Sequence, residues 1–434
     1  YPTLSGSLAI QVGAVNTNAA TIGTVTINAP ISGTFPLSKE YLGTLVLAGS
    51  NSFTGGLAVN GGVLQLGGSN ALNPSGSNAV SVASGAALRL NGFSPTIAGL
   101  TGSGTVEDGN ATVSTLTLNV ASGTSSFAGT LVNGAAGSLN LTKSGTGTQA
   151  LTGSSTYTGT TTLSGGVLSV SSSASLGSGT APMNFTAATT LNASADLTLT
   201  KPITQNAAAT YDVDATKTLT IGGTIAGGSQ LFKTGAGTLV LGVVNTYSAQ
   251  TNVNGGTLRL GVANAIAGPN VAVVGGTFDL AGFNESLGTN APTFTLGNSG
   301  TAGAIVGSGT ITTGTGGNGY QVAYGSVSGS SVLSGSAGLT KTTAQTVTLS
   351  GNNAYSGTTN VQNGTLAIST VGLATAIQSL GTNATVNLGV ASTSSGILQY
   401  TGVSGTLGKN VFALGNGTDT IQNAGSGLLT LSGT

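Results

Sequence analysis

Residues 231–260 read LFKTGAGTLVLGVVNTYSAQTNVNGGTLRL, and the expected fold follows from this stretch and its copies. Its last run, Thr257-Leu258-Arg259-Leu260, alternates polar and apolar residues with a period of two, which is the pattern of a half-buried β-strand. The Gly255-Gly256 pair before this run can adopt positive φ angles at little steric cost and marks a sharp corner. The stretch is thus expected to form short strands joined by tight turns.

Three further copies of this stretch lie at residues 37–66, 141–170 and 339–368. An aromatic residue occupies the same position in every copy, with spacings by subtraction of 104, 90 and 108 residues between Phe53, Tyr157, Tyr247 and Tyr355. In the copy at 141–170 the pattern predicts strands at 148–152, 160–163 and 167–170. Repetition of this kind indicates a repetitive all-β architecture and not a set of unrelated domains.

The composition is that of a folded chain with very few charges. Glycine contributes 74 of the 434 residues, 38% are hydrophobic and 4% are charged, nine basic against nine acidic. The apolar content separates the chain from disordered linkers, which cannot bury enough apolar surface to offset the entropy of ordering. The basic residues stand singly and no apolar run reaches the ~20 residues of a membrane span, so neither nucleic-acid binding nor membrane insertion is expected. With so few titratable groups, we expect stability to be nearly independent of pH.

Two all-β architectures accommodate short, evenly spaced strands: a string of β-sandwich domains and a β-solenoid. A sandwich exposes one face of each sheet and usually carries charges there. Here the expected outward positions are Thr, Ser, Asn and Gly, and such residues form hydrogen-bonded ladders when they stack in adjacent coils. We therefore predict one continuous right-handed parallel β-helix over residues 1–434, a single elongated rod with ~20–24 residues per coil.

The copies resemble the autotransporter-associated β-strand repeat of bacterial passenger domains and related surface proteins. In the copy at 231–260 the resemblance is carried by Leu231, Lys233, Gly235, Gly237, Leu239, Leu241, Gly242, Asn245, Tyr247, Thr251, Val253, Gly256, Leu258 and Leu260. The four copies cover a little over a quarter of the chain. The resemblance implies a right-handed parallel β-helix outside the cell, in which the repeats act as scaffold, and it implies no activity.

The two ends of the chain resemble two halves of one repeat. Residues 421–434 match its first half and residues 1–10 its second half, so joining the C-terminus of one copy to the N-terminus of another restores the pattern. Because no polar cap is recognisable at either end, the sequence predicts head-to-tail stacking of identical chains into an open filament. The residues expected to make this contact are Tyr1, Pro2, Leu4, Leu8, Ile10, Leu428, Leu429, Leu431 and Thr434.

The predicted function is that of a structural subunit of an extracellular or cell-surface fibre, secreted as a mature chain without a signal peptide. The alternative is an autotransporter-like passenger or adhesin fragment that binds a cell-surface glycan or protein along its side. No catalytic, cofactor-binding or metal-binding residue is predicted. The chain is not expected to be an enzyme, because it has no His or Cys to act as general base or nucleophile.

Two acidic segments are the candidates for cation binding. Asp212 and Asp214 share one face of a strand and could bind Ca²⁺, although a solvated strand end is the favoured interpretation. The segment Glu107-Asp108-Gly109-Asn110 could also hold a cation, and it is interpreted first as a turn.

Two repeat positions allow either a functional or a structural interpretation. The basic position could form a stripe that binds acidic glycans, but we favour corner lysines whose stems cover apolar neighbours and whose ammonium groups lie in water. This position is occupied by Lys39, Lys143, Lys233 and Lys341. The aromatic position could stack on sugars, but packing of the ring against a turn is favoured, since Gly or Ser lies within two residues in every copy.

Overall fold

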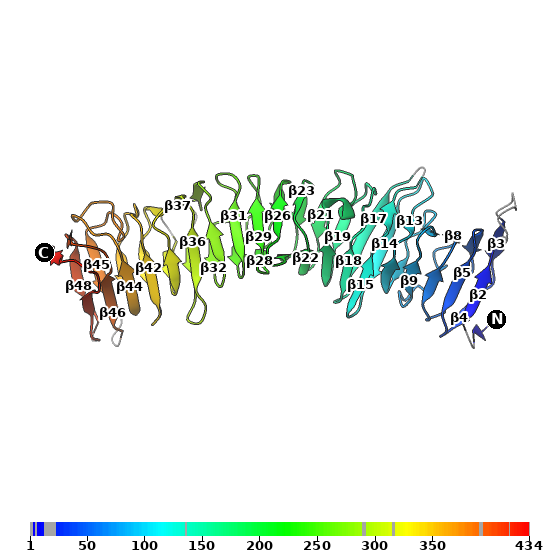
Figure 1. The fold of residues 1–434 in the computed structure, drawn as a ribbon, viewed down its shortest axis with the longest axis horizontal. Coiled ribbons are helices and arrows are strands. Elements are labelled where there is room, and N and C mark those ends of the chain that lie inside the picture. The colour runs from blue at the N-terminus through cyan, green and yellow to red at the C-terminus, as the bar shows by residue number, and fades with distance from the viewer. Residues whose placement is uncertain are drawn as a thin grey trace. The chain divides into compact units, whose positions relative to one another are not determined.

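The computed structural model describes residues 3–4, 7–12, 23–134, 137–288, 292–314, 317–389, 394–415 and 417–433. The chain forms two compact units, Tyr1–Asp212 and Val213–Thr434. Within each unit, short strands stack in parallel, one above the next, from coil to coil (Figure 1). Each unit is therefore an all-β solenoid, which confirms the predicted fold class. The prediction that the chain forms one continuous, right-handed rod stays a prediction.

Three parallel sheets form the faces of unit 1. The first contains β2 (Leu8–Gln11), β5 (Leu37–Glu40), β7 (Leu57–Val59), β9 (Ala79–Val82), β12 (Gly99–Gly102), β15 (Thr124–Phe127), β18 (Thr148–Leu151), β20 (Val167–Val170) and β22 (Thr189–Ala193). The second contains β3 (Thr24–Ile27), β6 (Thr44–Leu47), β8 (Val63–Leu66), β10 (Ala87–Arg89), β13 (Thr105–Glu107) and β16 (Thr130–Val132). The third contains β11 (Thr96–Ile97), β14 (Ser114–Asn119), β17 (Leu139–Ser144), β19 (Thr161–Leu163), β21 (Met183–Phe185) and β24 (Ile203–Gln205). The other elements are β1 (Thr3–Leu4), β4 (Ser32–Gly33), the 3₁₀ turn η1 (Ser173–Leu176), β23 (Leu197–Leu199) and β25 (Ala209–Val213).

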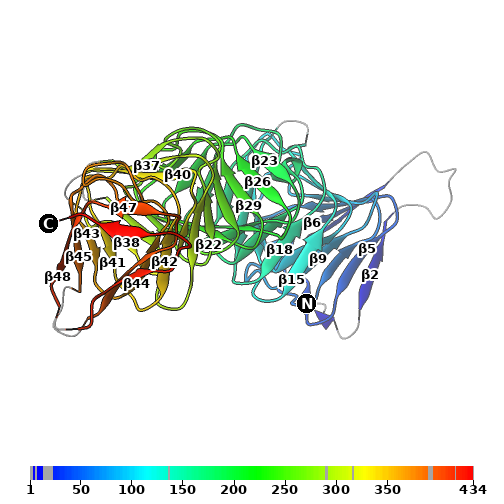
Figure 2. The same ribbon diagram turned by 60° about the vertical axis from the view of Figure 1, so that its left-hand side comes forward.

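Two long parallel sheets dominate unit 2, and Figure 2 shows β43, β45 and β48 on a different face from β42 and β44. One contains β28 (Leu231–Thr234), β30 (Thr251–Val253), β32 (Asn270–Val273), β35 (Thr293–Leu296), β38 (Gly319–Val322), β41 (Leu339–Lys341), β43 (Thr359–Val361), β45 (Thr385–Leu388) and β48 (Asn410–Ala413). The other contains β26 (Thr218–Ile221), β29 (Thr238–Leu241), β31 (Thr257–Leu260), β33 (Thr277–Asp279), β36 (Gly303–Val306), β39 (Gly325–Val327), β42 (Thr346–Leu349), β44 (Gly364–Ile368), β46 (Gly396–Tyr400) and β49 (Thr420–Asn423). The other elements are β27 (Ile225–Gly227), β34 (Glu285–Ser286), β37 (Gly309–Thr313), β40 (Ser331–Gly335), β47 (Gly405–Leu407) and β50 (Leu429–Leu431).

The strand register gives the length of a coil. Leu37 pairs with Leu57 and Leu57 pairs with Val80, so these two coils take 20 and 23 residues by subtraction. Both values fall in the predicted range, whereas Thr365 pairs with Ile397, so that coil takes 32 residues by subtraction and exceeds the range. The longer coil has the extra residues in its corner, where a loop can grow without disturbing the strand ladder.

The core consists of aliphatic side chains stacked one above the other. On the second sheet of unit 1 the register places Leu45, Leu64, Leu88, Val106 and Leu131 in one column, and all five have no exposed surface. Each such side chain contributes roughly 1.5–3 kcal/mol relative to an exposed one. This column is the physical reason why alternating Val, Leu and Ile dictate the solenoid.

The copy at 141–170 folds almost as predicted. Its three expected strands are β18, β19 and β20, which begin and end within one residue of the expected bounds, and the end of β17 adds a fourth strand at 141–144 that was not predicted. Gly166 occupies the corner with a φ of 63°, and a Cβ there would lie 2.4 Å from the carbonyl oxygens of Gly145 and Gly147. Only glycine therefore fits this corner. The short turn η1, capped by the Ser172 side chain, was not predicted.

Candidate functional site

The lysine of every repeat copy lies inside the solenoid, and the prediction that its ammonium is in water is wrong. The residues with no exposed surface at this position are Lys39, Lys143, Lys233 and Lys341. Lys143 Nζ donates to three backbone carbonyl oxygens, at 2.6 Å to Ser144, 3.1 Å to Gly145 and 3.1 Å to Gly165. The ammonium charge is thus satisfied by backbone dipoles at a corner of the coil.

The same contact to the next coil recurs in all copies. The other lysines donate to a carbonyl 22 residues further along the chain, in the pairs Lys39–Gly61 at 3.0 Å, Lys233–Gly255 at 3.1 Å and Lys341–Asn363 at 3.0 Å. Each ammonium therefore ties a corner of its own coil to the corner of the next. A glycan-binding stripe at this position is excluded, because none of the four lysines reaches the surface. The signal was present in the sequence, since Lys233 follows Leu231 at i+2 and the two share the inward face.

The aromatic position is structural, as favoured from the sequence. Tyr157, Tyr247 and Tyr355 have no exposed surface, so none can stack on an external sugar. A Cβ on Gly177 would lie 3.0 Å from the Tyr157 ring, which shows that the ring packs against the turn that follows η1. The phenol oxygen of Tyr157 lies 2.7 Å from the hydroxyl of Thr161, within hydrogen-bonding distance. Burial raises the pKa of Tyr157 well above its usual range and keeps the phenol neutral.

We expect Tyr157→Phe to lower the free energy of unfolding by about 1–2 kcal/mol, because it leaves the buried Thr161 hydroxyl without a partner. In the copy at 37–66 the two equivalent positions already hold an apolar pair, Phe53 and Leu57. The double variant Tyr157→Phe/Thr161→Val should therefore recover most of the loss. Urea unfolding followed by circular dichroism tests this, and a double variant less stable than the single one would contradict it.

A third repeat position connects three coils. The side chain of Asn245 accepts the Ile225 backbone N–H at 2.8 Å and donates to the Ala265 carbonyl at 2.7 Å. Asn51 and Asn353 make the same pair of bonds in their copies. Buried amide groups thus replace backbone ladder bonds where the chain has no strand. The polar ladders predicted for the outer surface also exist, as in the 2.8 Å bond from Asn387 to Asn360.

The acidic segments serve the fold. Glu107 forms a 2.7 Å ion pair with Arg89, and the buried Asp108 accepts hydrogen bonds from the Gly92 N–H and the Ser114 hydroxyl. Asp212 accepts a hydrogen bond from Asn192 at 2.9 Å. No group of three or more His, Cys, Asp or Glu side chains that could hold a metal occurs in the described part of the chain.

The residues predicted for self-association fall in both units, and no single unit brings them together. Leu8 and Ile10 are half-buried on β2, which pairs with β5. The strand β50, which pairs with β47, contains the half-buried Leu429 and the 55% exposed Leu431, and Leu428 just before it is 71% exposed. Each of these two strands, β2 and β50, is paired along one edge, and no described strand pairs with its other edge. Leu4 lies in β1, and Tyr1, Pro2 and Thr434 lie outside the described residues.

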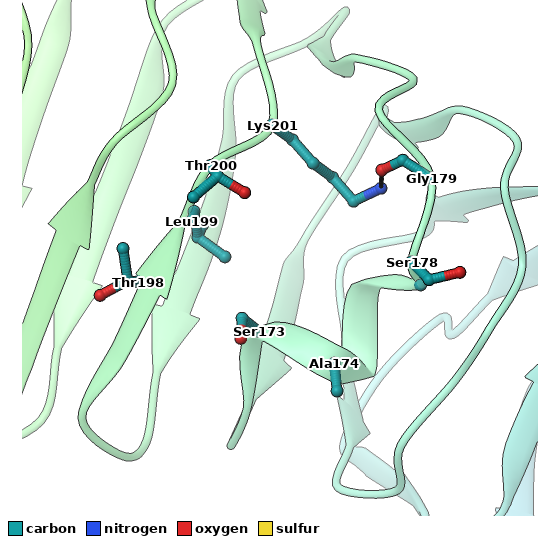
Figure 3. Close-up of a pocket in the computed structure, with 9 residues that line it drawn as sticks. Ser173, Ala174, Ser178, Gly179, Thr198, Leu199, Thr200 and Lys201 are labelled. Atoms are coloured by element: carbon teal, nitrogen blue, oxygen red, sulfur yellow. Dashed lines mark hydrogen bonds between the residues drawn. The ribbon is translucent and has the colours of Figure 1, made fainter.

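One recess opens on the outer surface of unit 1, between η1 and the end of β23 (Figure 3). It has a volume of about 270 Å³ and is lined by Ser173, Ala174, Gly177, Ser178, Gly179, Thr198, Leu199, Thr200 and Lys201. Lys201 is only 8% exposed and its ammonium donates to the carbonyl of Gly179. This recess could not be predicted from the sequence, because Lys201 lies outside the four copies and the other lining residues come from two successive coils.

Comparison with known proteins agrees with the repeats found in the sequence. The passenger-associated-transport-repeat family matches residues 37–66, 141–170, 231–260 and 339–368. The adhesin BmaC autotransporter of Brucella suis biovar 1 (strain 1330) is 33% identical over 223 residues, which is 50% of this chain and only 6% of that protein. No solved structure matches the chain, and no helix among the described residues has the length and apolar character to span a membrane. The chain therefore carries four repeats of the autotransporter passenger type and is similar over half of its length to an autotransporter adhesin.

Proposed function

We propose that this chain is scaffold of a cell-surface adhesin and that it contacts its partner, a surface glycan or protein, through the lateral surface of the solenoid. The observation that carries the proposal is the similarity to an autotransporter adhesin over half of the chain. The inward position of the repeat lysines and tyrosines supports it, since these residues act on the fold and leave recognition to the outward residues. A location at the cell surface or outside the cell is part of the proposal.

A binding role also agrees with the chemistry of the chain. With no His and no Cys, the sequence lacks the commonest general base and a thiol nucleophile. The acidic residues Glu107 and Asp108 are engaged in contacts that hold adjacent coils together. We therefore propose that the chain acts without catalysis.

Beads coated with the purified chain test this role. We expect them to be retained on cultured epithelial cells or on an array of immobilised glycans and matrix proteins. Retention should saturate and should be blocked by excess free chain. Albumin-coated beads are the control, and equal retention of both kinds of beads on every surface would overturn the proposal.

A second candidate is a fibre built by head-to-tail stacking of identical chains. It is favoured by the exposed Leu431 in β50 and Leu428 just before it, since the outer edge of β50 has no partner among the described strands. Such an edge can pair with a further coil of any origin. Electron microscopy of the purified chain distinguishes the candidates. Filaments that shorten in Leu428→Asp would support the fibre, and monomers at all concentrations would exclude it.

A further inference from the structure

The recess beside η1 combines hydroxyl groups with one buried ammonium. Ser173, Thr198 and Thr200 line the recess and are exposed, whereas Leu199 is 2% exposed and lies beneath them. Figure 3 shows Lys201 extending across the recess to Gly179. The recess is thus concave and combines hydroxyl groups with one charged group, and polar groups of this kind can orient a small polar ligand.

Lys201 differs from the repeat lysines in how its charge is satisfied. Lys143 has three carbonyl acceptors, whereas among the described residues Lys201 has one, the carbonyl of Gly179. An ammonium has three N–H donors, so two remain for water or for a ligand. A buried donor without a protein acceptor is costly unless something else accepts from it.

We propose that this recess binds a sugar residue that carries a carboxylate, such as a uronic acid unit of an acidic glycan, with the Lys201 ammonium contacting the carboxylate. The hydroxyls of Ser173 and Thr200 would exchange hydrogen bonds with the sugar hydroxyls. The proposal rests on the proposed adhesin role for its biological use, but the binding itself can be measured without cells.

Two features of the recess favour a sugar over other anions. Its volume of about 270 Å³ exceeds what a bare carboxylate or phosphate occupies, and it can hold one pyranose ring. It is lined by hydroxyls and contains one ammonium without an arginine fork, which is the group best matched to phosphate. No aromatic residue lines it, so stacking of a nucleobase is not supported.

Saturation-transfer difference NMR of the full chain with D-glucuronate tests the proposal. We expect binding with a Kd on the order of 1 mM, and at least about tenfold weaker binding of D-glucose and of inorganic phosphate. Equal signals from glucose would show that Lys201 plays no part, and equal affinity for phosphate would show an anion site without a sugar pocket. Either result, or no binding at all, would overturn the proposal.

Three variants locate the site. Lys201→Met should weaken glucuronate binding by about tenfold or more, whereas Lys217→Met, which changes a half-buried lysine outside the recess, should leave it unchanged. Ser173→Trp fills the recess from an exposed position and should abolish binding even if Lys201→Met is poorly folded. Binding that survives in Ser173→Trp would place the sugar elsewhere. Loss of sugar binding with intact adhesion of coated beads would refute this site alone and leave the adhesin role standing.

Discussion

Lys143→Met is expected to lower the free energy of unfolding by about 2–4 kcal/mol at neutral pH, because three half-buried backbone carbonyls lose a charged donor. Methionine preserves most of the side-chain volume, so the loss reports the hydrogen bonds and not a cavity. Burial lowers the pKa of Lys143 to about 8, which still leaves the ammonium mostly charged at pH 7. The contact with Gly165 belongs to the next coil, so the damage should spread over two coils.

Lys217→Met is the matched control for this prediction. Lys217 is half-buried, and substitution there should change stability by no more than about 0.5 kcal/mol. Urea unfolding measures the loss of stability of the whole chain, and hydrogen exchange across residues 139–170 measures the local loss. Both are needed because repeat arrays can unfold in parts. Equal unfolding midpoints for the two variants, with equal exchange at 139–170, would show that the lysine contacts do not stabilise the corner.

The strands and corners of the copies could be predicted from the sequence because they depend on local patterns. A period of two sets the inward residues of a strand such as β20, and a paired glycine such as Gly165-Gly166 sets the corner. The lysine position was misjudged for a physical reason. Lysine is rarely buried, so an exposed ammonium was expected. The period of two nevertheless places Lys143 on the same inward face as Leu141.

Features that depend on several coils at once could not be predicted. The recess requires η1 to lie opposite the residues after β23, and this depends on the length of the corner between two coils. The buried Glu285 is a second example, since a single sequence does not show that the turn around Ala265 and Ile266 lies over it. Long-range placement of this kind follows from packing and not from any local pattern.

Glu285 should make the stability of unit 2 fall as pH rises from about 4.5 to about 8, contrary to the pH independence expected from composition. Burial raises the pKa of Glu285 from 4.5 to about 8, although backbone N–H groups, including that of Ile266, oppose the shift. In this window the folded chain binds the proton and the unfolded chain does not, so stability is greatest below pH 4.5 and declines by up to about 1.4 kcal/mol per pH unit. The neighbouring Tyr247 stays neutral throughout, because burial raises its pKa far above its usual range.

Glu285→Gln isolates this carboxyl group. The amide resembles the protonated acid in shape and can still accept from Ile266, so the variant should match the parent chain at pH 4.5 and exceed it in stability at pH 8. Glu107→Gln, which changes an ion-paired carboxylate near the surface, is the control and should leave the slope intact. Lysines such as Lys341, whose pKa burial lowers to about 8, add stability only as pH rises above 8 and so do not mask the slope. Urea unfolding midpoints at several pH values measure how stability changes with pH. Parallel pH profiles for Glu285→Gln and the parent chain would show that this carboxyl group is already ionised in the folded protein.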